Sequence, residues 1–399
     1  MKYLLIVPDG LTEDPWGSEK TPLEVAHTPF LDDLAGRGIF GFVRTIPQGF
    51  HPGSEIGNMV LLGYDPSRYF TGRGPIEAAS KGLKLKDDDI VFRCNLVTLY
   101  PSISGVYMLD YSAGHISDEE ASEIIDTLNK YMSTEDRYFV KGKSYRNLMV
   151  WGKKRPKSVE RAELPAPHDI VGKNTVDLLK DKEILKVLTE SQLILKDHPV
   201  NKRRREKGER EANSIWLWGQ GRMPKFKKIK DLYGIDGAVI SAVDLVKGLG
   251  VLAGLEVIEV EGATGYIDTN YEGKAEAALD ALKRKDFVYV HIEAPDEAGH
   301  SGDFDLKKKV IEDFDRRFLG RLMKGLSEFS DWRLLLLPDH PTPISLKTHS
   351  SQPVPFVLVD GRDQRKSEAL FSERRKSSNF ISDGTRLIKM LFEGCSIED

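Results

Sequence analysis

The sequence predicts an α/β protein with a mostly parallel sheet flanked by helices, and a smaller α+β domain inserted into it. Apolar, strand-like runs alternate with helical patterns in the first and last parts of the chain, as in parallel sheets with crossover helices. The middle of the chain instead has several strand-like runs and a single long helical pattern. With 399 residues, the chain is also too long for one ordinary core.

The N-terminal part predicts one buried strand and two helices. Residues 3–7 form an apolar run that ends in Pro-Asp-Gly, as expected of a strand buried on both faces. Residues 28–37 have helical spacing, with Thr28 as the expected N-cap and a proline directly after it. After a Pro-Gly turn, Ser54 is expected to cap a helix that starts at Glu55.

We expect the inserted domain to span residues 89–189, and the larger domain to consist of residues 1–88 and 190–399. Inside the insertion, VFRCNLVTLY, SGVYMLD and RNLMVWG predict strands. ISDEEASEIIDTLNKYM predicts a helix with Ser117 as its N-cap and Glu120 closing a capping box. The charged run KRRREKGER is expected to be a solvated connector.

After the insertion, strands and helices alternate again. Strands are expected in GAVISAV, LEVIEV, DFVYVHI, RLLLLP and VPFVLV, and helices at residues 274–283 and 305–327. Lys274 is a weak candidate for contact with a ligand, and exposure to solvent is the favoured interpretation. Asp9, Asp296 and Asp339 each follow an apolar run. In parallel sheets, ligand sites lie beyond the carboxyl ends of the strands, so these aspartates are expected to lie close together.

Polar residues in four short segments predict a site for two divalent metal ions. Asp296 and His300 are four residues apart, which places both on one face of a helical turn. Asp339 and His340 are neighbours at a strand end, where they can turn toward two different ions. A serine that contacts such an ion can become a nucleophile. The predicted site consists of Asp9, Ser54, Asp296, His300, Asp339, His340 and His349.

Each of these residues has a structural alternative. Asp9 beside a glycine could be only a turn residue, and Ser54 only an N-cap. His300 and His349 could be loop histidines with ordinary hydrogen bonds, and His340 could support a ligand. The joint occurrence of three strand-end aspartates and three of the chain's nine histidines in Gly/Pro-rich loops favours a site.

The composition excludes several other classes of protein. A net charge of −4 gives no reason to expect nucleic-acid binding. The two cysteines, Cys94 and Cys395, form no metal-binding or redox motif. The apolar N-terminal run is too short for a signal peptide, and no stretch is long enough to span a bilayer. We therefore expect a cytoplasmic enzyme that does not bind membranes; its oligomeric state is not predicted.

The chain resembles the cofactor-independent (2,3-bisphosphoglycerate-independent) phosphoglycerate mutases of the archaeal type, within the alkaline phosphatase superfamily. The resemblance runs nearly from end to end. The segments that carry it are KTPLEVAHTPFLDDLAGRG, PGSEIGNMVLLGYDP, YFTGRGPIEAA, FRCNL, GATGYIDT, HIEAPDEAGHSGD and PDHPTPISLKTH. It implies an alkaline-phosphatase-like sheet. Pro338 and Pro341 stand where this family usually has Gly and Ser.

The resemblance also implies a metal assignment and a reaction. The two ligand groups would be Asp9, Ser54, Asp339 and His340 for one ion, and Asp296, His300 and His349 for the other. Manganese is the ion implied most often, with Mg²⁺, Co²⁺ or Zn²⁺ as alternatives. Ser54 would be phosphorylated transiently while 3-phosphoglycerate and 2-phosphoglycerate interconvert, with the inserted domain clamping the substrate.

The partner expected from this reaction is a small phosphorylated carboxylic acid. Arginine suits bidentate contact with carboxylate or phosphate. The candidate substrate-binding residues are Arg73, Arg93, Asn95, His115 and Arg146.

Other functions remain open from the sequence. HPVNKRRREKGEREANSIWLWGQG and PHDIVGK resemble a bacterial subgroup proposed to phosphorylate homoserine. A homoserine kinase-like phosphotransferase needs a nucleotide site, and the chain has no GxxxxGK[ST] loop and no GxGxxG after a strand. A metal-dependent phosphomonoesterase and a non-enzymatic metal-binding protein are the further alternatives.

Overall fold

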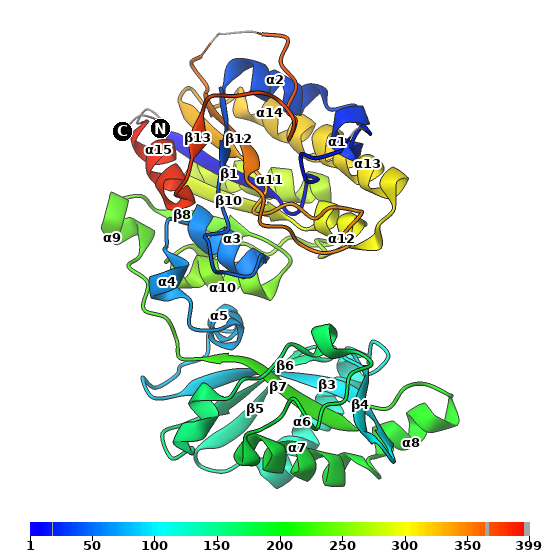
Figure 1. The fold of residues 1–399 in the computed structure, drawn as a ribbon. Helices are drawn as coiled ribbons and strands as arrows, with labels where there is room; N and C mark the ends of the chain where they lie inside the picture. Colours follow the sequence, from blue (N-terminus) through cyan, green and yellow to red (C-terminus); the bar gives the residue numbers. More distant parts are fainter. Residues whose placement is uncertain (18, 364–366, 395–399) are drawn as a thin grey trace. The chain divides into compact units, whose positions relative to one another are not determined.

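The protein divides into two compact units. The computed structural model describes residues 1–17, 19–363 and 367–394, so that Cys395 lies outside the described residues. Residues 1–70 and 225–399 form the first unit, and residues 71–224 form the second (Figure 1). The second unit is wider than the predicted 89–189 insertion on both sides, because α5 (Arg73–Ser80) and β7 (Ser214–Gly221) both pack on β3 (Ile90–Ser102).

The first unit is built on an eight-stranded sheet. In order across the sheet, its strands are β13 (Phe380–Ile381), β2 (Ile39–Val43), β12 (Val354–Asp360), β11 (Trp332–Leu336), β1 (Lys2–Pro8), β10 (Phe287–Ile292), β8 (Gly237–Ile240) and β9 (Glu256–Val257). The central strands β11, β1, β10 and β8 are parallel to one another, and only β12 is antiparallel to its neighbours. The predicted α/β class with a mostly parallel sheet is confirmed.

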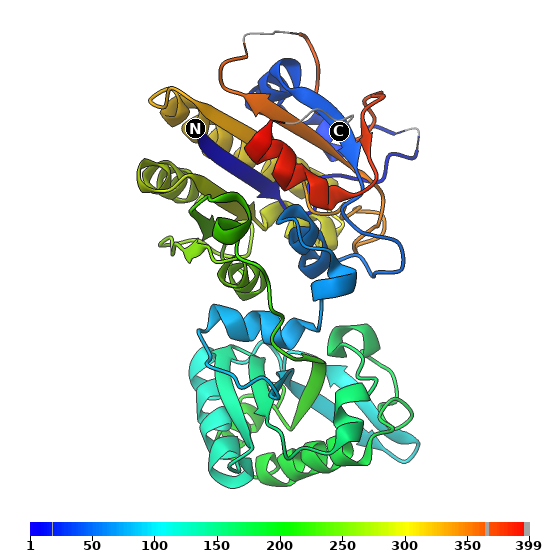
Figure 2. The same cartoon turned by 90° about the vertical axis from the view of Figure 1, so that its left-hand side faces the viewer.

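Helices pack on the two faces of this sheet (Figure 1, Figure 2). Alternate residues of a strand point to opposite faces. Leu4 and Ile6 of β1 therefore belong to a core shared with helices on one face, namely α2 (Pro29–Arg37), α11 (Tyr271–Arg284), α13 (Phe304–Asp313) and α14 (Gly320–Leu326). On the other face, Tyr289 of β10 reaches helix α3 (Ser54–Leu61), and Val239 of β8 packs against α10 (Asp244–Leu252). Burial on both faces explains why these strands are continuous apolar runs.

The helical segments of this unit are short. They are α1 (Pro22–Val25), α2 (Pro29–Arg37), α3 (Ser54–Leu61), α4 (Pro66–Tyr69), α9 (Ile229–Tyr233), α10 (Asp244–Leu252), α11 (Tyr271–Arg284), α12 (Ala294–Ser301), α13 (Phe304–Asp313), the π-helical η3 (Phe314–Leu319), α14 (Gly320–Leu326), the 3₁₀ turn η4 (Gly384–Arg386) and α15 (Leu387–Glu393). The single helix predicted over residues 305–327 is thus a succession of α13, η3 and α14.

One of two predicted N-caps is confirmed and the other is wrong. Thr28 is the N-cap of α2, which begins at Pro29 as predicted, but its hydroxyl donates to Asp32 Oδ2 (3.3 Å) and makes no capping bond. The N-cap of α3 is Gly53, and Ser54 is the first residue of the helix itself. The extended backbone of Gly53 makes the turn, so the Ser54 hydroxyl is not used for capping.

The second unit is an antiparallel sheet with helices. Its strands are β4 (Gly105–Asp110), β3, β6 (Arg146–Trp151) and β5 (Arg137–Lys143), with β7 also paired to β3. Its remaining elements are α6 (Asp118–Met132), η1 (Lys157–Arg161), η2 (Pro167–Ile170), α7 (Lys182–Leu195) and α8 (Pro199–Glu206). In the described part of the chain, no helix has both the length and the apolar character needed to cross a membrane.

Two details of this unit correct the sequence predictions. Ser117 caps α6 as predicted, by accepting from Glu120 N (3.2 Å), but the Glu120 carboxylate pairs with Arg204 instead of closing a capping box. The run predicted as a solvated connector is partly helix α8, and Arg204 within it is buried and donates to Ala113 O (2.9 Å). A buried arginine keeps its charge only with such partners.

Candidate functional site

The three strand-end aspartates lie at one edge of the first unit's sheet. Strands β11, β1 and β10 are adjacent and parallel, so their carboxyl ends share that edge. Asp9 directly follows β1, Asp339 follows β11, and Asp296 lies on α12 after β10. The chain turns away after Asp9 at Gly10 (φ 59°), where an added Cβ would lie 2.7 Å from Asp296 Oδ1. Glycine therefore allows these two loops to approach closely.

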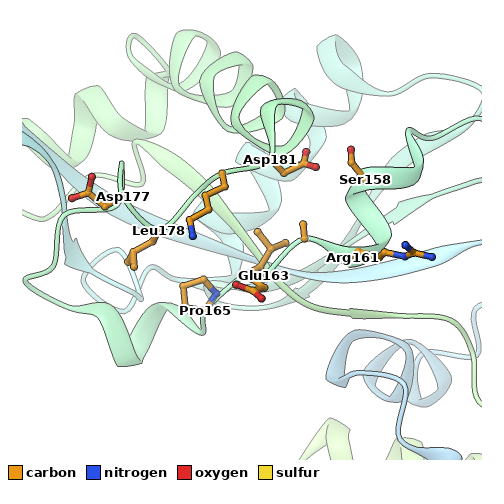
Figure 3. A pocket seen from close by; sticks show the side chains of 10 residues that line it. Ser158, Arg161, Glu163, Pro165, Asp177, Leu178 and Asp181 are labelled. Carbon is orange, nitrogen blue, oxygen red and sulfur yellow. The ribbon is translucent and has the colours of Figure 1, made fainter.

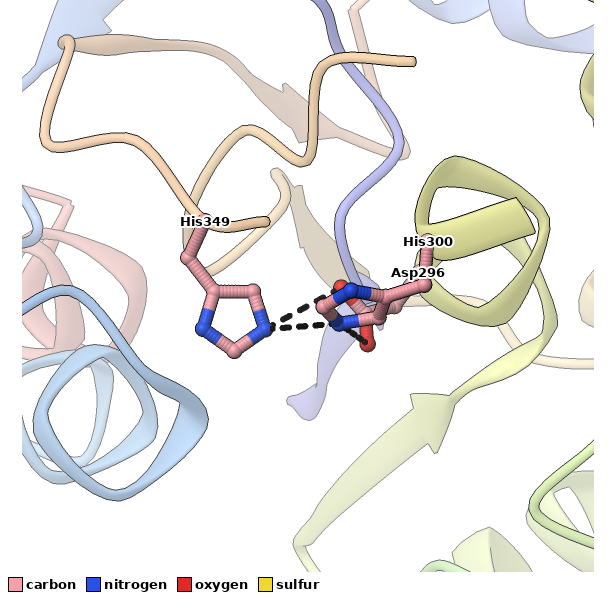
Figure 4. Close-up of side chains that lie close together, drawn as sticks. All are labelled: Asp296, His300 and His349. Carbon is pink, nitrogen blue, oxygen red and sulfur yellow. Dashed lines mark hydrogen bonds and ion pairs between the residues drawn. The ribbon is translucent and has the colours of Figure 1, made fainter. Parts of the chain in front are cut away.

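Asp296, His300 and His349 form one compact group (Figure 4). His300 Nε2 lies 3.2 Å from Asp296 Oδ2, and His349 Nε2 lies 3.5 Å from Asp296 Oδ1. The two imidazole Nε2 atoms are 3.1 Å apart. As the four-residue spacing predicts, Asp296 and His300 share one face of α12. Burial raises the pKa of Asp296, but the hydrogen bonds from His300 and His349 outweigh it, and the net shift is downward.

The hydrogen bonds of the two histidines point to a cation between them. His300 Nδ1 faces Lys347 O (3.0 Å), and His349 Nδ1 faces Pro52 O (3.2 Å). A carbonyl can only accept, so each Nδ1 carries a proton; a ring without a second proton on Nε2 then offers a lone pair there. Two lone pairs and a carboxylate that converge on one point are the donor set of a divalent metal ion, and a backbone acceptor on the far nitrogen is the usual support for a histidine ligand.

Asp9, Asp339 and His340 form the second group. His340 Nε2 lies 3.5 Å from Asp9 Oδ1 and 3.6 Å from Asp339 Oδ2. Ser54, at the start of α3, has its hydroxyl oxygen 3.4 Å from Asp9 Oδ2 and 3.4 Å from His340 Nε2. The N-terminus of a helix carries free N–H groups and a partial positive charge, so it favours a bound anion.

The electrostatics of the second group suit a bound cation. Asp9 Oδ1 is buried and has no hydrogen-bond partner among the described residues. Burial raises the pKa of Asp9 well above its usual value, and the nearby Asp339 and Asp296 carboxylates raise it further. A divalent cation would satisfy the orphaned oxygen and relieve this repulsion. The residues present therefore fit metal ions, and all seven residues predicted for the site lie in the two groups or beside them.

Several supporting residues were not predicted from the sequence. Asn58 donates to Asp339 Oδ2 (2.7 Å) and to Ser54 O (2.8 Å), and it accepts from the hydroxyl of Tyr289. Thr342 donates to Asp296 Oδ1 (2.5 Å). A single polar residue in an apolar segment or a loop produces no periodic pattern in the sequence. The only available signal is the family resemblance, because PGSEIGN contains Asn58 and PDHPTPISLKTH contains Thr342.

The candidate substrate-binding residues all belong to the second unit. Arg93 on β3 is buried, with its guanidinium 4.5 Å from the centre of the Trp218 ring, and Arg73 is 5.6 Å from the same ring. Asn95 accepts from Trp218 Nε1 (3.0 Å). Burial lowers the pKa of Arg93 to about 10; Glu77 opposes this shift, whereas Arg73 and Arg146 add to it. Arg73, Arg93 and Arg146 therefore form a cationic cluster, and the guanidinium groups of Arg73 and Arg93 lie over the Trp218 ring.

The two other candidates lie at the margin of this cluster. The Arg146 guanidinium is 5.1 Å from the Tyr145 ring, and the His115 ring is 6.2 Å from the same ring. His168, within the segment PHDIVGK, packs edge-on against Trp218 with ring centres 5.5 Å apart. Trp218 and Tyr145 thus connect the predicted residues, and neither was identified from the sequence.

The second unit also has a cavity of about 850 Å³ that contains none of the predicted residues (Figure 3). Its walls are formed by residues 158, 161–165, 177, 178, 180 and 181. The lining mixes acidic and basic side chains with apolar ones. This mixture does not indicate a particular class of ligand.

The fold and site together define an α/β enzyme with candidate metal ligands at the carboxyl edge of a mostly parallel sheet. A family profile described as 2,3-bisphosphoglycerate-independent phosphoglycerate mutase matches residues 35–201. The mutase of that name from Methanosarcina acetivorans is 51% identical, over 98% of this chain and 99% of its own. A probable mutase of the same name from Geobacter sulfurreducens is 47% identical, over 98% of this chain and 100% of its own.

Solved structures agree with this assignment. A Pyrococcus horikoshii protein superposes with a TM-score of 0.81 and 29% identity, over 99% of this chain and 98% of its own. The cofactor-independent phosphoglycerate mutase of Thermoplasma acidophilum gives a TM-score of 0.61 and 26% identity, over 99% and 100%. The chain belongs to the family of 2,3-bisphosphoglycerate-independent phosphoglycerate mutases, which are metal-dependent isomerases. The resemblance inferred from the sequence segments is confirmed.

Proposed function

We propose that this enzyme interconverts 3-phosphoglycerate and 2-phosphoglycerate through a phosphorylated Ser54. The observation that carries the proposal is the position of the Ser54 hydroxyl, 3.4 Å from both Asp9 Oδ2 and His340 Nε2 and next to the two ligand groups. The names of the relatives at 47–51% identity support the same substrate.

We assign the ligands in two groups. One ion would be held by Asp9, Ser54, Asp339 and His340, and the other by Asp296, His300 and His349. When bound, divalent ions supply Lewis-acid stabilisation of phosphoryl oxygens and acidify a coordinated hydroxyl. Mn²⁺ suits this mixture of imidazole and carboxylate ligands, and so do several other divalent ions.

The chain's own residues then account for both halves of the reaction. Ser54 Oγ attacks phosphorus, so that a Ser54 O–P bond forms while the substrate's O–P bond breaks. Asp9 Oδ2 accepts the hydroxyl hydrogen bond and is placed to receive the Ser54 proton. The departing glycerate oxygen takes up the proton that Asp9 received. In the second half, the other glycerate hydroxyl attacks the phosphoserine and gives its proton to Asp9. The bond between Ser54 Oγ and phosphorus breaks, and Ser54 regains a proton from Asp9.

We further propose that the cluster around Arg93 binds the substrate's anionic groups. Trp218 holds the guanidinium planes of Arg73 and Arg93, and planar guanidinium groups match carboxylate oxygens in pairs. Glu77, 3.2 Å from Arg93 Nε, fixes the direction of that side chain.

A direct assay tests the proposal. Purified enzyme with Mn²⁺ should convert 3-phosphoglycerate to its 2-isomer without added bisphosphoglycerate, and Ser54→Ala should abolish conversion while leaving the fold intact. Ser67→Ala is the matched control, because Ser67 also lies at the start of a short helix but is exposed. Mass spectrometry of enzyme quenched during turnover should find phosphate on Ser54.

Parallel reactions separate the rival functions. Phosphorylation of homoserine with ATP would identify a kinase, and release of inorganic phosphate as the main product would identify a phosphomonoesterase. Either result without isomer formation, or full activity of Ser54→Ala, would refute the proposed function.

A further inference from the structure

Lys274 on α11 is completely buried, contrary to the prediction that it is exposed. Its ammonium group donates to Glu293 Oε2 (2.6 Å) and to His291 O (3.0 Å). A buried lysine is costly unless it is paired and hydrogen-bonded. Lys274 is therefore a paired internal charge of the protein and not a surface lysine.

Glu293, the partner of this lysine, is held from three sides. Its Oε1 accepts from Ser241 Oγ (2.7 Å) and from Ala242 N (2.9 Å), and the same oxygen lies 3.2 Å from His291 Nδ1. With Lys274 on Oε2, both oxygens are occupied. The glutamate is therefore a rigid acceptor for the imidazole of His291.

His291 connects this pair to the metal site. It is fully buried at the end of β10, on the same side of the strand as Tyr289, and its Nε2 lies 3.3 Å from Asp9 Oδ2. Both ring nitrogens thus face carboxylate oxygens. Ionised carboxylates can only accept, so the favourable arrangement is an imidazole with a proton on each nitrogen. Lys274, Glu293, His291 and Asp9 then form a buried row of alternating charge.

We propose that His291, oriented by Glu293 and Lys274, is a positioning residue for Asp9. The contact is an ion pair: His291 Nε2 lies 3.3 Å from Asp9 Oδ2 without hydrogen-bond geometry. It would leave Asp9 Oδ1, which has no hydrogen-bond partner among the described residues, available to an ion shared with Asp339 and His340. The inference rests on the proposed function, because it takes Asp9 to be a ligand.

The surroundings of the other two aspartates show why Asp9 needs such a partner. Asn58 donates to Asp339, and Thr342 donates to Asp296. Among the residues that the structure describes, Asp9 has no comparable amide or hydroxyl donor apart from Ser54, which the proposed reaction uses. Its carboxylate is repelled by the two others, and His291 is the group that opposes this repulsion from the protein side.

Metal affinity is the test, because it does not depend on turnover. Electron paramagnetic resonance of free Mn²⁺ measures binding to the full-length protein at two sites. In His291→Phe we expect one of the two binding events to weaken by about 10–100-fold, the usual effect of removing such a support, while the other stays unchanged. His291→Gln, which keeps one N–H donor, should recover part of the loss. In turnover, kcat should fall and KM should stay near the wild-type value.

A charge-balanced variant protects the test against misfolding. Lys274→Met combined with Glu293→Gln removes the pair together and leaves no unpaired buried charge; it should weaken the same binding event. Lys285→Met is the matched control, since Lys285 pairs with Asp236 (2.9 Å) and Glu256 (3.1 Å) before the start of β10, away from the site. It should bind both ions normally.

The outcomes distinguish the two proposals. If wild-type protein binds two Mn²⁺ ions and the His291 and Lys274/Glu293 variants bind them equally well, the positioning role is wrong and the proposed function stands. If wild-type protein binds no divalent ion, the proposed function itself fails. Equal weakening of both binding events would also overturn the inference, because Asp9 belongs to only one ligand group.

Discussion

The contact between α3 and the Asp339 loop allows a demanding prediction at Gly57. This glycine lies one turn after Ser54, and its Cα faces the backbone of Asp339. A Cβ added at Gly57 would lie 2.6 Å from Asp339 O, 2.9 Å from Asp339 Cβ and 3.1 Å from Asp339 C. Gly57→Ala therefore adds one methyl group at the point where the helix that carries Ser54, the proposed nucleophile, touches the segment that carries Asp339 and His340, two proposed ligands.

The size of the effect follows from these distances. Ordinary Cβ contacts begin at 3.4 Å, so the helix and the loop must separate by about 0.8 Å at the closest contact. Overpacking of this kind costs about 1–3 kcal/mol of stability, partly offset by about 0.5–1 kcal/mol from replacing a helical glycine. A misplacement of about 1 Å can reduce the rate about 100-fold. We expect kcat to fall between 10- and 100-fold, as an estimate on this basis, with a folded protein.

Steady-state turnover of 3-phosphoglycerate and urea unfolding measure the two effects separately. Gly265→Ala is the control, because a Cβ there meets only Val243 Cγ2, at 3.7 Å. Wild-type kcat in Gly57→Ala would refute the reasoning, since it would mean that α3 and Asp339 need not be held at their observed separation. A loss of activity explained entirely by unfolding would refute it as well.

Three further predictions concern metal, substrate and pH. Chelation should abolish activity and added Mn²⁺ should restore it, because the donor atoms within each ligand group lie within 4.8 Å of one another, close enough to share one ion; activity in protein shown to be metal-free would contradict this. Arg93→Lys should raise KM at least about tenfold, because lysine cannot make the paired contact of a guanidinium. Arg203→Lys, at an exposed ion pair with Glu123, is the control and should leave KM unchanged. An unchanged KM in Arg93→Lys would show that the cluster does not bind the substrate. Burial raises the pKa of Asp315 from 3.8 to about 6, so the folded state binds this proton more tightly than the unfolded chain and loses stability as pH rises from about 4 to about 6. Relative to Asp315→Asn, wild-type protein should therefore lose up to about 3 kcal/mol of unfolding free energy across that range, and parallel pH profiles of the two proteins would contradict the assignment.

The seven candidate residues of the proposed metal site were accessible from sequence because their signals are local. Each aspartate follows an apolar run within a few residues, and the four-residue spacing of Asp296 and His300 already implies one helical face. The parallel arrangement of β11, β1 and β10 follows from the alternation of strands and helices. No long-range information was needed to expect these side chains at one edge of the sheet.

The supports of these residues were not accessible in the same way. Lys274 has ordinary helical surroundings in the sequence, and nothing local distinguishes a buried lysine from an exposed one. His291 lies within an apolar strand, where its neighbours in sequence do not indicate that Asp9 and Glu293 will face its two nitrogens. The N-cap at Ser54 was misassigned for a related reason: the residue type indicates a helix start, but only the local backbone decides which residue caps it. Thr28 is the N-cap of α2 as predicted, although its side chain makes no capping bond.

The sequence by itself determined the class of fold, the seven candidate ligands including Ser54, and the family, because strand periodicity, strand-end polar residues and family segments are all encoded in short stretches. Only the tertiary structure decided the extent of the two units, the packing of Arg73 and Arg93 on Trp218, and the buried charges of Lys274, Glu293, His291 and Asp9. These features depend on which strands are neighbours and which side chains are buried together. Packing between segments up to hundreds of residues apart sets both. In such a buried environment a hydrogen bond or a charge interaction is strongest, because water is excluded.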